Sequence, residues 1–249
     1  MLKSLPIVLL LVAALDLRAA DGTWTAASGG NWSDPAKWSA ATVADGAGAT
    51  ADFNTLDLAA DTTVRLDGDR SLTSLVFGDI NTATAASWTL DNNGTPSNNL
   101  ILAGTTPTIT VNALGTGKST TISAVIQGSA GLAKAGSGTL VLGAANTYTG
   151  ATEVRAGRLK LGAAGALGDA VSHTSGVSVT GGAILDLGGF SPTAIVPLTL
   201  NSNANGFDVG AFLNSGALSV TYGGDITLLQ QTRFGGTGAM LLTGAITGN

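Results

Sequence analysis

The 249-residue sequence has no cysteine, a single histidine and a single glutamate, and only 11% of its residues are charged. Without cysteine there are no disulfide bonds and no thiol chemistry, so packing and backbone hydrogen bonds must hold the fold together. The net charge is −5 and lysine and arginine form no cluster. Nucleic-acid binding depends on side chains that neutralise phosphates, so this class of function is excluded.

What the chain does contain is apolar and small. Hydrophobic residues make up 44% of the sequence and glycine occurs 36 times, whereas aromatic residues reach only 5%. Disordered chains show the opposite balance, with low hydrophobicity and high charge. The chain can therefore bury a core, and Thr, Ser, Asn and Gly must cover its surface. This composition is typical of strands joined by tight turns.

Residues 1–20 have the pattern of a secretory signal peptide. Lys3 precedes an apolar run from Leu5 to Leu15, and Leu17 and Ala19 stand at suitable −3 and −1 positions for cleavage. The run is too short for a membrane span, which needs about 20 residues. We expect a secreted protein that begins near Ala20 or Asp21, with no transmembrane segment after cleavage.

The mature sequence predicts an all-β protein. Short apolar or alternating runs recur along it, and Gly, Asn, Asp or Pro separates nearly all of them. The best helical candidate, LGAAGALGDAV at residues 161–171, is weakened by its three glycines, each of which costs about 1 kcal/mol relative to alanine.

The segment from residue 21 to residue 51 is distinguished by three of the four tryptophans, Trp24, Trp32 and Trp38. Large aromatic side chains suit the closing of an open core end, and repeat proteins need such caps. The same rings could instead form a platform on which sugars stack. We therefore expect an N-terminal cap element at 21–51, with carbohydrate binding as the alternative role.

Residues 131–162 contain a specific motif: a Gly-Leu-x-Lys start, a Gly-x-Gly-Thr-Leu-x-Leu strand, an Asn-Thr-Tyr-x-Gly turn and a Val-x-x-Gly-x-Leu strand. This segment resembles the autotransporter-associated β-strand repeat, also called the passenger-associated transport repeat. The positions that carry the resemblance are Gly131, Leu132, Lys134, Gly136, Gly138, Thr139, Leu140, Leu142, Asn146, Thr147, Tyr148, Gly150, Val154, Gly157 and Leu159.

The resemblance implies an all-β, right-handed parallel β-helix, a β-solenoid, over residues 52–249. Coils of roughly 20 to 25 residues would stack about 4.8 Å apart, which gives about 10 coils. The apolar run Leu140, Val141 and Leu142 is expected to face the core. A second repeat is expected to start at 235–249, where Gly236, Gly238, Met240 and Leu242 match Gly136, Gly138, Leu140 and Leu142.

No residue pattern predicts catalysis or metal binding. Glycoside hydrolysis needs two facing carboxylates, and Glu153 has no partner at strand spacing. Asp67, Asp69 and Asp79 form the densest acidic cluster, but they occur in turn sequences. The segment GGAILDLGG at 181–189 only partly matches a calcium-binding nonapeptide, and His173 lacks companions for a zinc site. We expect no catalytic residue, cofactor or metal.

The sequence thus favours a secreted or cell-surface structural or adhesive solenoid without enzymatic activity. A carbohydrate-binding module using the tryptophans and a β-helical polysaccharide-degrading enzyme are the alternatives. Surface polysaccharide or another cell-surface component is the expected partner. End-to-end self-association is also expected, because AMLLTGAITGN at the C-terminus is apolar and rich in β-formers.

Overall fold

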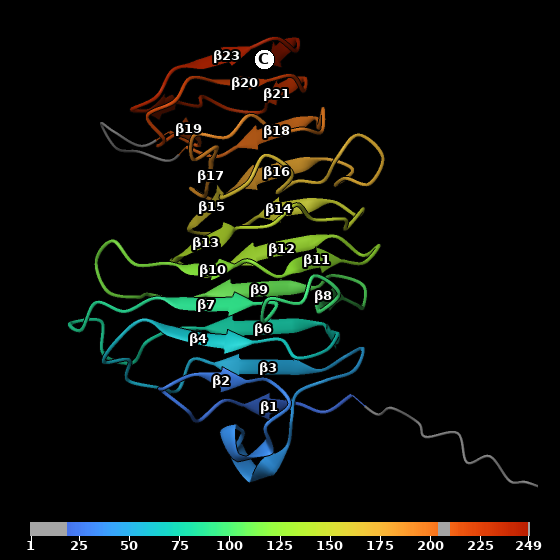
Figure 1. Cartoon of the computed structure of the whole chain (residues 1–249). Helices are drawn as coiled ribbons and strands as arrows, with labels where there is room; N and C mark the ends of the chain where they lie inside the picture. The colour runs from blue at the N-terminus through green and yellow to red at the C-terminus, as the bar shows by residue number, and fades with distance from the viewer. Residues whose placement is uncertain (1–18, 204–209, 249) are drawn as a thin grey trace, which may run out of the picture.

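The computed structural model describes residues 19–203 and 210–248. The predicted signal peptide therefore lies outside the described residues, apart from its last two positions. The described chain winds into a stack of coils that rises steadily from its N-terminal to its C-terminal part (Figure 1).

Two long sheets run along the stack. The first has ten strands: β1 (Gly22–Thr23), β3 (Thr50–Phe53), β6 (Ser74–Phe77), β9 (Thr108–Val111), β12 (Leu132–Ala135), β14 (Thr152–Val154), β16 (Val177–Thr180), β18 (Leu198–Asn201), β21 (Ile226–Leu228) and β24 (Ile246–Gly248). The second has nine: β2 (Gly30–Asn31), β4 (Thr62–Arg65), β7 (Trp88–Asp91), β10 (Thr120–Ile122), β13 (Thr139–Leu142), β15 (Arg158–Leu161), β17 (Ile184–Asp186), β19 (Phe212–Asn214) and β22 (Phe234–Gly236).

Within residues 19–203 and 210–248, a third side carries strands in two places. A three-stranded sheet contains β5 (Arg70–Leu72), β8 (Asn99–Leu102) and β11 (Val125–Gln127), and a two-stranded sheet contains β20 (Val220–Tyr222) and β23 (Met240–Leu242). Between them, the chain crosses this side in turns and irregular segments.

All pairings between these strands are parallel and join successive coils; a strand inside a sheet pairs on both sides, whereas a strand that ends a sheet pairs on one side. This arrangement confirms the predicted parallel β-solenoid. The coils are less uniform than expected: paired residues are 20 positions apart at Leu132 and Thr152 but 34 apart at Ser74 and Thr108. The longer coils carry loops outside the strands, which leaves the register of the sheets intact.

Alternation along each strand decides which side chains enter the core. On β13, Leu140 and Leu142 are buried, whereas Val141 and Thr139 are half-buried on the outer face. The expectation that Val141 faces the core was therefore wrong. Consecutive side chains of a strand point to opposite faces, so a run of three apolar residues cannot all point inward.

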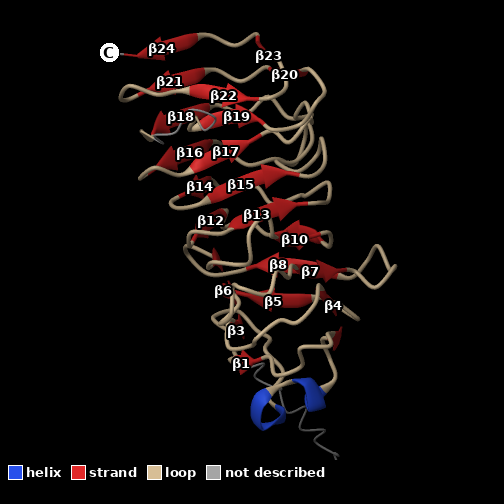
Figure 2. Ribbon diagram, turned by 90° about the vertical axis from the view of Figure 1, so that its left-hand side faces the viewer, coloured by secondary structure: helices blue, strands red, loops and turns tan. Residues whose placement is uncertain are grey.

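Helical structure is nearly absent from residues 19–203 and 210–248. Two three-residue 3-10 helices, η1 (Pro35–Lys37) and η2 (Ser39–Ala41), lie below the first coils (Figure 2). Residues 161–171, the best helical candidate in the sequence, form a strand end and turns. In this part of the chain no helix has the length and apolarity needed to cross a membrane.

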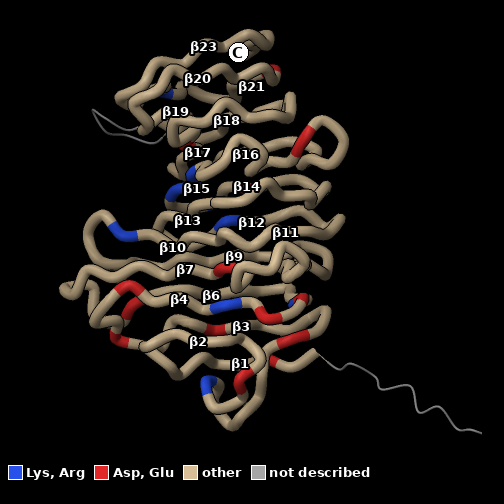
Figure 3. The backbone as a smooth tube through the Cα atoms, in the orientation of Figure 1, with Lys and Arg blue, Asp and Glu red and all other residues tan. Residues whose placement is uncertain are grey.

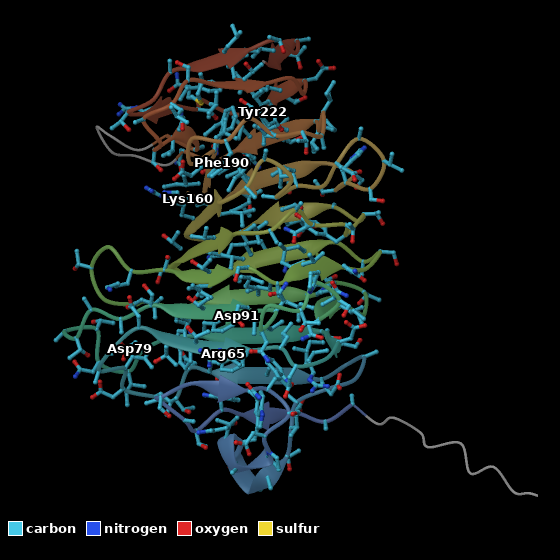
Figure 4. The ribbon with its side chains drawn as sticks, viewed as in Figure 1. Arg65, Asp79, Asp91, Lys160, Phe190 and Tyr222 are labelled. Atoms are coloured by element: carbon cyan, nitrogen blue, oxygen red, sulfur yellow. The ribbon has the colours of Figure 1, made fainter. Side chains whose placement is uncertain are left out.

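Charged side chains are sparse and unevenly distributed. Acidic residues gather on the N-terminal coils, whereas the later coils carry few charges of either sign (Figure 3). Interior side chains fill the space between the sheets, including Tyr222 in the upper coils (Figure 4). Its hydroxyl donates a hydrogen bond of 2.7 Å to the carbonyl of Val196, so this polar group is satisfied inside the core.

Candidate functional site: the motif coil

The motif at residues 131–162, here called the motif coil, lies in the middle of the solenoid and spans two successive turns of the stack, because β12 (Leu132–Ala135) pairs with β14 (Thr152–Val154) and β13 (Thr139–Leu142) pairs with β15 (Arg158–Leu161). It contributes β12 and β14 to the ten-stranded sheet and β13 and β15 to the nine-stranded sheet. Its apolar motif positions Leu132, Leu140, Leu142, Val154 and Leu159 are all buried. These residues form part of the apolar core of both turns, whereas the polar motif residues connect neighbouring coils by hydrogen bonds.

The glycines of the motif allow neighbouring backbones to approach closely. Gly131 has a φ of 83°, and a Cβ atom there would lie 2.2 Å from the carbonyl oxygen of Ala151. A Cβ atom at Gly150 would lie 2.3 Å from the amide nitrogen of Gly131. Both separations are far below van der Waals contact, so any side chain at either position would force the two coils apart.

Lys134 is fully buried in β12, between Ile109 and Val154 of the adjacent coils. Its Nζ donates three hydrogen bonds, to the carbonyls of Ala135 at 2.7 Å, Gly136 at 2.8 Å and Ala156 at 3.0 Å. Burial lowers the pKa of its ammonium group to about 8. The three acceptors match the three hydrogens of the charged form, so this lysine joins the corners of two successive coils.

Asn146 links three coils through one side chain. Its Oδ1 accepts a hydrogen bond of 2.8 Å from the amide of Ile126 in the preceding coil, and its Nδ2 donates one of 2.8 Å to the carbonyl of Ala166 in the following coil. The side chain is buried, so both polar atoms need these partners. An apolar residue of similar size would leave a buried amide and a buried carbonyl unpaired.

Tyr148 begins a buried chain of hydroxyl groups. Its hydroxyl lies 2.9 Å from Oγ1 of Thr152, which donates to Oγ1 of Thr174 at 2.9 Å. Thr174 in turn donates to the carbonyls of Gly150 and Gly176. Burial raises the pKa of Tyr148 to about 12, against the lowering effect of its hydrogen bond with Thr152. The Asn-Thr-Tyr-x-Gly turn is thus fastened to the next coil by polar contacts inside the core.

The remaining motif residues occupy backbone corners or the outer surface. Gly157 has a φ of 63° and packs against the carbonyls of Gly136 and Gly138 in the coil before it. Thr139 pairs with Arg158 of the next coil on the outer face, and the amide of Thr147 donates to the carbonyl of Ile126. The motif coil therefore joins successive coils through buried polar contacts and close backbone approaches.

The three N-terminal tryptophans are enclosed in the core. Trp24 and Trp32 are 0% exposed and Trp38 is 3% exposed. The ring centroids of Trp24 and Trp32 lie 5.1 and 4.9 Å from that of Trp38, and all three lie 5.4–5.8 Å from that of Phe53. Phe53 stacks on Phe77 of the next coil at 4.8 Å. The rings therefore close the lower end of the core. Buried rings present no face on which a sugar could stack, so this arrangement favours the cap over the sugar-stacking alternative.

The acidic residues singled out in the sequence are occupied by turn contacts. Asp67 accepts hydrogen bonds from Ser33 and pairs with Arg70 at 3.3 Å. Asp69 accepts from the amide and side chain of Asn99. Asp79 accepts from the amides of Leu58 and Asn81, in a different loop. Within the described ranges, no group of three or more acidic, histidine or cysteine residues is arranged to hold a metal.

Two further candidate residues lie apart from these. His173 is half-buried in a loop, where its Nδ1 lies 2.8 Å from the carbonyl of Thr174. Asp186, within the segment 181–189, is fully buried and accepts hydrogen bonds from Gly188 and Ser215. Its second oxygen lies 3.4 Å from Arg158. This carboxylate therefore holds a turn and does not form part of a repeated ligand set.

Sequence reasoning missed two groups of polar residues in the core. Thr152 and Thr174 complete the hydroxyl chain from Tyr148, and Asn214 links the amides of Gly189 and Gly216 to the carbonyls of Leu218 and Ala239. Asn214 thus connects the backbones of successive C-terminal coils, as Asn146 does in the motif coil. An Asn followed by a glycine-rich turn was the available signal, but such turns also occur at the surface.

The expected second repeat at 235–249 lies at a different corner of the solenoid from the motif at 131–162. Gly236 has a φ of 107° and lies against Asn214 of the preceding coil, much as Gly136 lies against Val111. However, Gly136 joins the ten-stranded sheet to the nine-stranded sheet, whereas Gly236 joins the nine-stranded sheet to the β20–β23 pair. The likeness between the two segments is one of turn geometry, at two different corners.

Comparison with known proteins agrees with this geometry. Residues 132–161 match the family model described as the passenger-associated-transport-repeat. The chain is also 38% identical, over 130 residues, to a protein named "Adhesin BmaC autotransporter" from Brucella suis biovar 1 (strain 1330). The alignment covers 50% of this chain and only 4% of that protein. No solved structure matches the chain. Residues 132–161 are therefore a passenger-associated transport repeat, set in a solenoid distantly similar to part of an autotransporter adhesin.

Proposed function

We propose that this protein is an exported, passenger-like β-solenoid that acts at the cell surface as a rigid adhesive or structural element and has no catalytic activity. The observation that carries the proposal is the transport repeat, which is continuous with parallel sheets on both sides. A stack in which every coil pairs with its neighbours is stiff along its axis and presents a long regular surface. Such a body suits contact and support.

The chemistry of the surface supports the non-catalytic part of the proposal. Glu153 is paired with Arg155 at 2.6 Å, and the other acidic residues discussed above serve turns. Several buried polar side chains bond to backbone groups or to each other, namely those of Asn146, Tyr148, Thr152, Thr174, Asn214 and Tyr222. The polar groups that an enzyme would direct at a substrate are thus used to join coils in this molecule.

Adhesion can be tested with the purified protein coupled to fluorescent beads. We expect these beads to be retained on cell surfaces or on surface-polysaccharide films more strongly than beads carrying an unrelated protein of similar charge. Equal retention would contradict the adhesive role. Release of sugar fragments from the same polysaccharides would contradict the absence of catalysis.

Export is tested separately. When the full chain is expressed in a bacterium with a secretory pathway, the exported form should begin near Ala20 or Asp21 by N-terminal sequencing. An exported protein that retains Met1 would contradict cleavage of the predicted signal peptide.

A further inference from the structure

The outer face of the ten-stranded sheet is hollowed along β9, β12, β14, β16 and β18. One hollow of about 190 Å³ lies between the segment before β9 and Glu153, and a second of about 210 Å³ lies between Glu153 and Thr199. Ala151 and Glu153 line both. The two hollows therefore adjoin at these residues, and together, here called the trough, they follow the solenoid axis along the ten-stranded sheet, whose strands are labelled in Figure 1.

The register of the strands explains the trough. One outward column contains Thr108, Ala133, Glu153, Ser178 and Thr199, paired coil by coil. Beside it, Ala151, Gly176 and Pro197 precede their strands, and their carbonyls each accept a hydrogen bond of 2.9 Å from the coil before. These residues have small or no side chains, so the surface beside the polar column is recessed and forms the floor of the trough. Four coil steps make the trough about 19 Å long.

The lining of the trough combines two kinds of surface. Thr106, Ser178 and Thr199 offer hydroxyl groups, whereas Pro107, Ala151 and Pro197 offer C–H surface. The guanidinium of Arg155 is neutralised, because its Nε and Nη2 both donate to Oε2 of Glu153. The trough thus has no unpaired cation for an acidic ligand. It also lies on the face of the sheet, where backbone groups are paired, so a peptide could not add to it as a strand.

We propose that this trough binds a short stretch of a neutral glycan chain, laid along the solenoid axis. This inference deepens the proposed adhesive function and rests on it. A pyranose ring presents C–H groups on its faces and hydroxyls around its rim, which matches the small apolar floor and the hydroxyl column. Successive rings along an extended glycan would meet successive coils of the solenoid, so the regular stacking supplies the repeated contacts.

The test measures binding of the purified protein to neutral oligosaccharides of roughly four to five hexose units, sized to the trough, and to oligouronides of the same length. Isothermal titration or NMR titration gives the dissociation constant. We expect the neutral chains to bind and the acidic ones to bind more weakly. Ser178→Arg places a bulky side chain in the second hollow of the trough and should weaken binding at least about tenfold.

Thr121→Arg is the matched control, because Thr121 is half-buried on the outer face of the nine-stranded sheet. It should bind the neutral chains as wild type does. Equal loss in both variants, preference for the acidic chains, or no glycan binding at all would overturn the inference. The bead-retention experiment separates this failure from failure of the proposed function. If the beads adhere but the protein binds no glycan, the adhesive role is supported and the trough is not the adhesive site.

Discussion

At the scale of single residues, Lys134 is an ionisable side chain buried in the core. Its pKa is lowered to about 8 in the folded protein, from an ordinary value of 10.5. Between these values the unfolded chain binds more protons at this residue than the folded chain, so stability rises with pH across the window. We expect the free energy of unfolding of wild type, relative to Lys134→Met, to rise by at most about 3 kcal/mol from about pH 7.5 to about pH 10.

Urea unfolding of both proteins at several pH values measures this difference, and the buried tyrosines are common to both. Lys160→Met is the control, because Lys160 lies on the outer face of β15 (Figure 4). Its difference from wild type should stay nearly constant with pH. A constant difference for Lys134→Met as well would show that the buried ammonium group does not titrate in this range.

The hydroxyl chain from Tyr148 gives a second test at this scale. Tyr148→Phe keeps the ring and removes one hydroxyl, and Thr152 keeps its donor bond to Thr174. We expect a loss of about 1 kcal/mol. Thr152→Val should cost more, about 2 to 3 kcal/mol, because it removes a partner from both Tyr148 and Thr174 in the buried core. Thermal or urea unfolding would measure both losses, and an equal or larger loss for Tyr148→Phe would contradict this order.

At the scale of secondary-structure elements, β13 shows how alternation divides one apolar run between core and surface. Leu140 is fully buried, whereas Val141 lies between Thr121 and Lys160 on the outer face. We expect Leu140→Ala to lower the free energy of unfolding by about 2 to 5 kcal/mol. Val141→Ala should cost less than about 1 kcal/mol. Similar losses for the two variants, measured by urea unfolding, would mean that the strand is rotated from the orientation described here.

At the scale of the whole molecule, the last described coil has one uncovered side. Strands β22, β23 and β24 each end their sheet, and Leu241 and Ile246 are 60% and 49% exposed. Leu242 packs against the end of the core. Exposed apolar strand edges pair with other chains. We expect the 249-residue protein to self-associate through this coil, and Leu242→Lys to reduce the association, as measured by analytical ultracentrifugation.

Val171→Lys is a suitable control for this prediction. Val171 is 90% exposed in the loop before β16, which three strand pairings separate from β24, so a charge there should leave association unchanged. If wild type is monomeric at high concentration, or if both variants dissociate equally, the uncovered coil is not the contact surface.

The sequence alone determined the class of the fold and the location of its most specific coil. Short apolar runs separated by glycine and asparagine predicted strands, and the spacing of Gly131, Lys134, Asn146 and Tyr148 identified the repeat. These signals are local, because turns and strand periodicity depend on neighbouring residues. Only the tertiary structure decided that Val141 faces outward, that the tryptophans are enclosed, and that Thr152 and Thr174 complete the contacts of Tyr148. Those outcomes depend on which residues of successive coils pair, and a single sequence does not give this register because paired residues are between 19 and 34 positions apart.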